Sequence, residues 1–106
     1  MFARTVSLHL KPNSVAEFTQ IIEKDIIPLL RKQQGFQDEI AFVIRDGTEA
    51  VSVNLWDHKE HAEAYHRGTY PTMLKALAHV VDGTPEVHIY EVSNSTFHKL
   101  VPRAAI

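Results

Sequence analysis

Two side chains that could take part in oxygen chemistry, Asn54 and Trp56, lie two residues apart in the 106-residue chain. The stretch from Val51 to Trp56 alternates between two kinds of side chain, which is the pattern of a strand, and residues two apart on a strand share a face. A carboxamide could hold a substrate oxygen and an indole could stack on a ring. A carbanion formed from a phenolic substrate reacts with oxygen without a metal, so positioning and anion stabilisation would suffice.

Asn54 and Trp56 are therefore our first catalytic candidates. The structural alternative is that Trp56 fills one end of a barrel and Asn54 forms a hydrogen bond across a dimer interface.

Histidines and tyrosines on other predicted elements supply a second group of candidates. His9 and His88 are predicted to share one side of a sheet, with Tyr90 nearby. Because a histidine titrates near neutral pH, His9 could act as a general base toward a phenol. We predict His9 as catalytic and His88, Tyr90 and Tyr65 as substrate-binding. Alternatively, the histidines are structural groups inside a dimer.

The remaining histidines do not predict a metal site. His58 and His61 are three residues apart, but no carboxylate or third histidine stands at an obvious ligand spacing, so we interpret them as a solvated first helical turn. The chain has no cysteine, which excludes thiolate catalysis and cysteine-ligated metals. No glycine-rich phosphate loop is present. We predict neither a metal nor a bound cofactor.

Composition narrows the class of protein. The formal charge of −2 provides no basic field, which argues against nucleic acid as a partner. No apolar run approaches the ~20 residues that span a bilayer, and the first residues lack the layout of a signal peptide. We expect a cytoplasmic protein with one domain over residues 1–93 and a tail or dimer arm over residues 94–106.

The elements that would position these candidates follow from periodicity and turn residues. Capping boxes at Ser14/Glu17 and Asp57/Glu60 predict two helix starts, and Gly35 a helix stop. Pro28 predicts a kink or a tightened turn, or else two helices split at 25–28. Asp46-Gly47 predicts a type I′ hairpin. The predicted strands cover 2–10, 37–45, 51–56 and 86–92, and the predicted helices 14–34 and 57–81, the second interrupted at Gly68.

The order strand, helix, strand, strand, helix, strand predicts an α+β, ferredoxin-like βαββαβ fold with a four-stranded antiparallel sheet. We expect the first and third strands side by side and parallel in the centre, with both helices on one face of the sheet. Arg4 is the exception on the apolar side of its strand. The predicted helix-facing residues are Val6, Leu8, Leu10, Ile40, Phe42, Ile44, Val51, Val53, Leu55, Val87 and Ile89.

The opposite side of the sheet is predicted to be semi-polar, with Asn54 and Trp56 among its side chains. A solvated side would carry more Lys, Glu and Arg, so we expect a second copy to cover it in a twofold homodimer. The members of this side are Thr5, Ser7, His9, Ala41, Val43, Ser52, Asn54, Trp56, His88, Tyr90 and Val92.

Three segments carry a resemblance to a known family: 27–36, which ends in Gly35-Phe36, 54–56, which ends in Trp56, and 59–65. Together they resemble the antibiotic biosynthesis monooxygenase (ABM) family of the dimeric α/β-barrel superfamily, over residues 2–92. The resemblance implies a homodimer and a small oxygenase that acts on an aromatic or quinol-like compound without a cofactor. The alternative is a non-catalytic homodimer that binds a small apolar molecule. The haem-degrading branch places an asparagine at or beside Val6 and a histidine near Ala78 and His79, and Val6 departs from that pattern.

Overall fold

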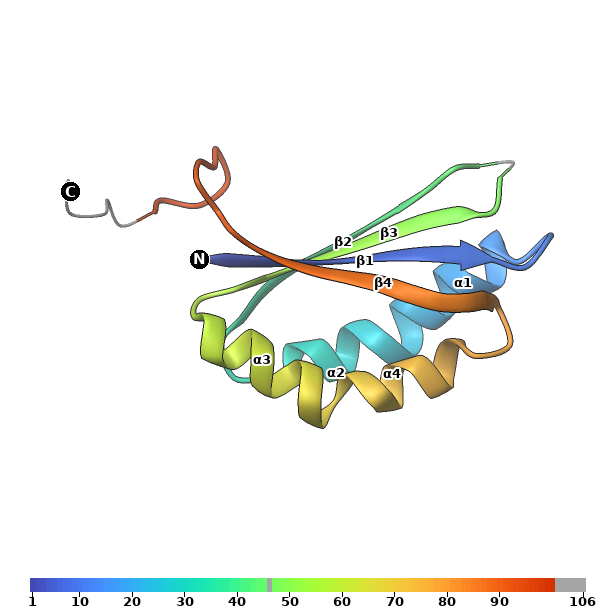
Figure 1. The fold of residues 1–106 in the computed structure, drawn as a ribbon, viewed down its shortest axis with the longest axis horizontal. Coiled ribbons are helices and arrows are strands. Elements are labelled where there is room, and N and C mark those ends of the chain that lie inside the picture. Colours follow the sequence, from blue (N-terminus) through green and yellow to red (C-terminus); the bar gives the residue numbers. More distant parts are fainter. Residues whose placement is uncertain (46, 101–106) are drawn as a thin grey trace.

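The computed structural model describes residues 1–45 and 47–100. One sheet lies on one layer of helices (Figure 1). The elements in chain order are β1 (Phe2–Leu10), α1 (Val15–Ile21), the π-helical turn η1 (Ile22–Ile26), α2 (Ile27–Arg31), β2 (Phe36–Val43), β3 (Glu49–Trp56), α3 (Lys59–Gly68), α4 (Tyr70–Leu77) and β4 (Val81–Glu91). The predicted ferredoxin-like α+β fold is confirmed.

The strand order β2-β3-β1-β4 confirms that the first and third strands occupy the centre of the sheet. They are antiparallel, however, and the predicted parallel pairing is wrong. The helical connection makes β2 run in the same direction as β1, and the β2–β3 pair is antiparallel. The third strand must therefore oppose the first.

The first helical segment is continuous but changes its winding before Pro28. The N–H of Ile27 bonds to the carbonyl of Ile22, five residues back, so the turn widens rather than kinking or tightening as predicted. A π-turn of this kind absorbs one extra residue inside a helix. The helical segment ends at Arg31, three residues before the predicted end at 34, and Gly35 takes a left-handed φ of +82° in the turn that follows rather than at the helix end.

The predicted capping boxes do not form. Ser14 makes no side-chain bond to the α1 backbone and instead donates to the carbonyl of Pro12 at 3.5 Å. Helix α3 begins at Lys59, two residues later than predicted, and Asp57 accepts from the His58 N–H at 2.6 Å. The hairpin pair β2–β3 is confirmed, while the turn type predicted from Asp46 falls outside the described residues.

The last strand begins at Val81 rather than at the predicted residue 86. The segment 82–85, which separates the predicted helix 57–81 from the predicted strand 86–92, lies within this strand, and α4 ends earlier than predicted, at Leu77. A register shift in the β1–β4 pairing and a positive φ at Gly83 accommodate it. These turn-type residues therefore form an irregular stretch of an edge strand, where proline is tolerated.

The side chains of β3 face the opposite sides of the sheet from those that we predicted. Asn54 pairs with Arg4, so both side chains face the helices, and the buried residues of β3 are Ala50, Ser52, Asn54 and Trp56. Ile40 and Phe42 on β2 share the other side of the sheet with Val51 and Val53. We call that side, which none of the described helices covers, the open side (Figure 1). The predicted orientation is confirmed for Val6, Leu8 and Leu10 on β1.

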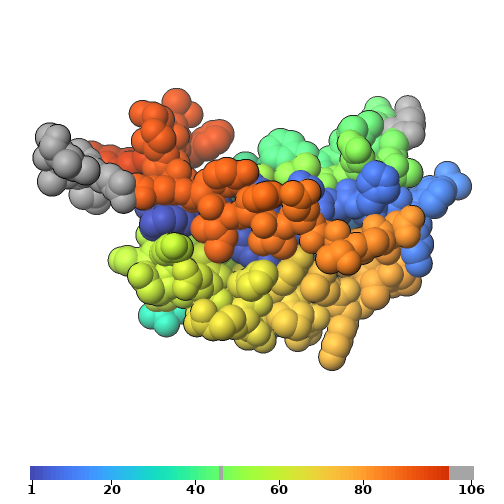
Figure 2. Space-filling model, in the orientation of Figure 1, coloured from blue at the N-terminus to red at the C-terminus, as the bar shows by residue number. Residues whose placement is uncertain are grey.

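The core lies between the sheet and the helices. In Figure 2, α3 and α4 (yellow) lie directly against β4 (orange). The largest fully buried side chains are Trp56, Arg4, Phe18, Leu10, Leu30, Met73 and Val80. Among the described residues, no helix is long and apolar enough to cross a membrane.

Candidate functional site

Polar side chains line the core side of the two central strands. Arg4 comes from β1, and Ser52 and Asn54 come from β3, where the antiparallel register sets Arg4 beside Asn54. Arg4 is 0% exposed and Asn54 is 2% exposed. A charged and an amide side chain in the core of a 106-residue protein are costly, so their presence calls for a reason other than packing.

A chain of hydrogen bonds fixes the asparagine. The Trp56 Nε1–H donates to Asn54 Oδ1 at 2.9 Å, and Asn54 Nδ2 donates to Glu39 Oε2 at 3.2 Å. Because the indole nitrogen can only donate, the amide orientation is determined. Ser52 Oγ donates to the other carboxylate oxygen, Glu39 Oε1. The carboxyl group of β2 is thus held by two side chains of β3.

Burial raises the pKa of the Glu39 carboxyl from 4.5 to about 7. The bonds from Ser52 and Asn54 and the charge of Arg4 act in the opposite direction, because they favour the ionised form. A carboxyl group with a pKa near neutrality can take up and release a proton under ordinary conditions, as a general base must.

The Arg4 guanidinium is enclosed by aromatic rings and a histidine. Its central carbon lies 4.0 Å from the centroid of the Tyr70 ring and 5.1 Å from that of Tyr65. Arg4 Nη2 donates to His66 Nδ1 at 2.9 Å. Since arginine cannot accept, His66 is the neutral tautomer that carries its proton on Nε2. Burial and the neighbouring Arg4 charge both lower the pKa of His66, which is consistent with that form.

The hydrogen-bonding capacity of Arg4 is only partly used. Within the described residues, its Nε and Nη1 atoms and the Tyr70 hydroxyl are buried without a hydrogen-bond partner. Each such group costs about 1–3 kcal/mol relative to a satisfied one. The cation–π contacts with the tyrosine rings offset part of this cost. These unused donors are the groups that a bound oxygen-bearing molecule would satisfy.

A small cavity separates this polar group from the helices. Its volume is about 30 Å³, enough for one or two water molecules. The polar side chains of β1 and β3 line one wall, and apolar side chains of the helical layer line the other. The lining residues are Arg4, Val6, Leu8, Ile22, Ile26, Ser52, Asn54, Tyr65, Tyr70, Met73, Leu74 and Leu77.

The six predicted site residues separate into two groups. Asn54 and Tyr65 line the cavity, and Trp56 bonds to Asn54 from behind it. His9, His88 and Tyr90 lie on the open side, because His88 pairs with Thr5 in the β1–β4 register. There His88 bonds to Glu86 at 2.9 Å, and its ring lies 6.0 Å from that of Tyr90.

Arg4 and Glu39 were not among the predicted site residues. A signal for Arg4 was present, because it interrupts the apolar side of β1. No such signal marked Glu39. Its strand contains a register shift between Phe36 and Asp38, which breaks the alternation of side chains just before Glu39.

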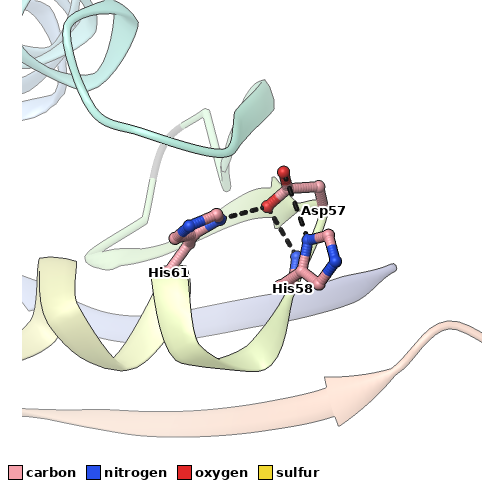
Figure 3. Close-up of side chains that lie close together, drawn as sticks. All are labelled: Asp57, His58 and His61. Atoms are coloured by element: carbon pink, nitrogen blue, oxygen red, sulfur yellow. Dashed lines mark hydrogen bonds and ion pairs between the residues drawn. The ribbon is translucent and has the colours of Figure 1, made fainter.

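A second polar cluster lies where β3 passes into α3. The carboxylate of Asp57 stands between two imidazoles: Oδ1 is 2.6 Å from His61 Nδ1, and Oδ2 is 3.3 Å from His58 Nδ1 (Figure 3). These bonds lower the pKa of Asp57, chiefly through His61. From the sequence we interpreted Asp57 only as a helix cap, and the prediction that no carboxylate stands beside this histidine pair is wrong.

No protein-family model and no curated protein sequence matches this chain. Solved structures do. A protein of unknown function from Nitrosomonas europaea, NE2512, is 20% identical, with a TM-score of 0.72 over 90% of this chain and 91% of that one. The cofactor-independent oxygenase SnoaB from Streptomyces nogalater is 15% identical, with a TM-score of 0.71 over 90% and 95%.

A monooxygenase from the ActVA-Orf6 gene of Streptomyces coelicolor, solved in complex with Nanaomycin D, is 15% identical, with a TM-score of 0.74 over 96% of this chain and 92% of that one. Other similar structures carry the provisional name antibiotic biosynthesis monooxygenase. At these identities the comparisons show a shared fold. The chain has the fold of proteins that are named antibiotic biosynthesis monooxygenases, the family that its sequence resembles.

Proposed function

We propose that this protein is a small oxygenase that converts an aromatic or quinol-like compound, bound between the sheet and the helices, without a bound cofactor. The observation that carries the proposal is the buried Arg4, which has unused N–H groups and lines the same cavity as Asn54. A phenolate or enolate oxygen would satisfy those donors and neutralise the charge. The fold shared with a cofactor-independent oxygenase supports the same reaction class.

The chemistry balances with dioxygen as the only co-reactant. Ser52, which lines the cavity and donates to Glu39, relays a proton from the substrate hydroxyl to that carboxylate. The resulting anion transfers one electron to dioxygen, and the two radicals combine to a peroxide anion on a ring carbon that bears a hydrogen. Glu39 returns its proton to give the hydroperoxide, and loss of water from that carbon leaves a carbonyl group. One oxygen atom enters the product, and the other leaves as water.

Substrate binding requires the helical wall to move. A cavity of about 30 Å³ is far smaller than the roughly 300 Å³ or more of a pocket for a ring compound. Ile22 and Ile26, at the two ends of the π-turn, belong to the apolar wall. Because π-turns are energetically poorer than α-helical turns and are frequent at functional sites, this segment is the part that we expect to yield.

The turnover test uses Asn54→Ala. With anthrone or a hydroquinone as substrate, we expect oxygen uptake by the variant to fall by about 10²-fold, because the fixed amide donor is lost. Oxygen uptake should fall less in Trp56→Phe, which removes only the hydrogen bond that orients the amide. Asn94→Ala, at an exposed residue of the tail, is the matched control. An oxygen electrode and the absorbance of the quinone product provide the two readings.

Uptake by Asn54→Ala equal to that of the control would contradict the site assignment. Ligands that raise the melting temperature of the wild-type protein without any oxygen uptake would instead favour the alternative, a homodimer that binds a small apolar molecule without converting it.

The open side of the sheet supports our proposal of a homodimer. It exposes large apolar side chains, among them Phe42 at 55% and Ile44 at 57%. Such a patch on a sheet side that no helix covers is typical of an interface. The original expectation placed Asn54 and Trp56 between the two sheets, but both face the helices of their own chain. Our proposal therefore keeps the contact on the side away from the helices, where Val51 and Val53 of β3 take the places that we predicted for Asn54 and Trp56.

Phe42→Asp should dissociate the dimer, because it places a charge in the proposed contact. Sedimentation at micromolar concentration should give twice the 12.0 kDa chain mass for the wild type and one chain for the variant. Lys75→Asp, at an exposed residue of α4 in the helical layer, should remain dimeric. A wild-type protein that sediments as a monomer would disprove the proposal.

A further inference from the structure

We propose that Asp57, His58 and His61 bind a first-row divalent transition-metal ion such as Zn²⁺. The cluster lies at the junction of β3 and α3, separate from the residues that line the cavity (Figure 3). The proposal does not depend on the oxygenase function.

The donor atoms are close enough to share one ion. One ligand atom from each residue lies within 4.8 Å of the other two. In a tetrahedral site with metal–ligand bonds of 2.0–2.2 Å, neighbouring donors are about 3.3 Å apart. The separation of Asp57 Oδ2 and His58 Nδ1 is already 3.3 Å. The 2.6 Å between Asp57 Oδ1 and His61 Nδ1 must open slightly as the ion replaces the shared proton.

Gly35 gives an independent reason to regard the cluster as built. A Cβ atom at this glycine would lie 2.2 Å from Asp57 Oδ1 and 2.3 Å from His61 Nδ1, so only glycine leaves room for both donors. The Asp57 N–H also donates to the Gly35 carbonyl at 2.9 Å. The turn between α2 and β2 thus holds the aspartate and the first turn of α3 in one arrangement.

Helix capping alone does not explain the arrangement. A cap accounts for the bond from the His58 N–H to Asp57, but it does not require two imidazole nitrogens on one carboxylate. Elsewhere, described histidine–carboxylate pairs such as His79–Glu17 have a single imidazole. The Asp57 cluster is therefore a different kind of group from an ordinary surface pair.

The donor set identifies the class of ion. Two imidazoles and one carboxylate suit zinc, nickel, copper or iron, whereas magnesium and calcium prefer oxygen donors alone. The His58 side chain is 68% exposed, so water can complete the coordination. The carboxylate also offsets the positive end of the α3 dipole, which would otherwise oppose a cation at this place.

The test is calorimetric titration of Zn²⁺ into untagged full-length protein. We expect one tight ion per chain, and a loss of at least 10-fold in affinity in His58→Ala and in His61→Ala. His79→Ala is the matched control, because it removes an exposed histidine that also contacts a carboxylate, and should bind as the wild type does. Gly35→Ala should weaken binding by crowding the two donors.

A measurement on the unmodified protein keeps the test independent of folding in the variants. In imidazole NMR spectra, Zn²⁺ should shift the signals of His58 and His61 before those of the other five histidines. The proposal is overturned if the first signals to shift belong to other histidines, if no tight ion binds, or if His79→Ala loses as much affinity as His58→Ala.

Discussion

Replacing Arg4 by methionine is expected to reduce turnover by about 10²-fold or more while raising the free energy of unfolding. The guanidinium is fully buried and has unused donors, so it costs the folded protein energy when no anion is bound. Methionine has a similar length and needs no partner. The same change removes the charge that would stabilise the substrate anion and the reduced oxygen. Function and stability should therefore move in opposite directions.

Thermal unfolding at pH 6 is the informative measurement for this variant. Below the pKa of about 7, Glu39 is mainly protonated and gives Arg4 little counter-charge, so the gain in stability should be largest there. Arg67→Met is the matched control, because the Arg67 side chain is 70% exposed, and should change neither quantity. A variant that unfolds more readily than the wild type yet keeps full turnover would show that Arg4 is a structural residue.

The chain order of elements and the position of the central strands could be predicted because they depend on alternation and turn residues. Which face of β3 points toward the core could not be predicted. Val51, Val53 and Leu55 are its more apolar members, and we assigned them to the core, yet Asn54 and Trp56 are the buried residues. Because Val51, Val53 and Leu55 are apolar although they lie on the open side, β3 carries no simple contrast between apolar and polar faces. The polar side chains went inward because they bond to each other and line the cavity.

Local signals failed where a tertiary partner offered a better bond. Asp57 matches a capping box, but its carboxylate is occupied by His61 and held against Gly35, two contacts that no short motif encodes. Glu39 became a site residue only through Ser52 and Asn54, which are more than ten residues away in sequence. The sequence could name Asn54, whereas its partners depend on the strand pairing.

The second prediction with a large effect concerns Glu39 and pH. Because burial raises the pKa of its carboxyl from 4.5 to about 7, the folded protein holds this proton where the unfolded chain has released it. Folding therefore favours the protonated form, and the associated stability is fully present below pH 4.5. It decreases as pH rises from 4.5 to 7 and then stays constant, for a total of the order of 3 kcal/mol.

Glu39→Gln removes this titration and keeps one acceptor oxygen for Asn54, while the Ser52 hydroxyl can accept from the new amide N–H. Its free energy of unfolding should lose the decrease between pH 4.5 and 7 seen in the wild type, while histidines such as His66 contribute equally to both proteins. Turnover should change with pH in the opposite direction, because only the ionised carboxylate accepts the substrate proton. The kcat of the wild type should rise with pH through about 7, and the kcat of the variant should stay low. Urea unfolding and oxygen uptake across the same pH series measure both. Identical pH profiles for the two proteins would mean that Glu39 does not titrate in this range, and the proton relay through Ser52 would have no acceptor.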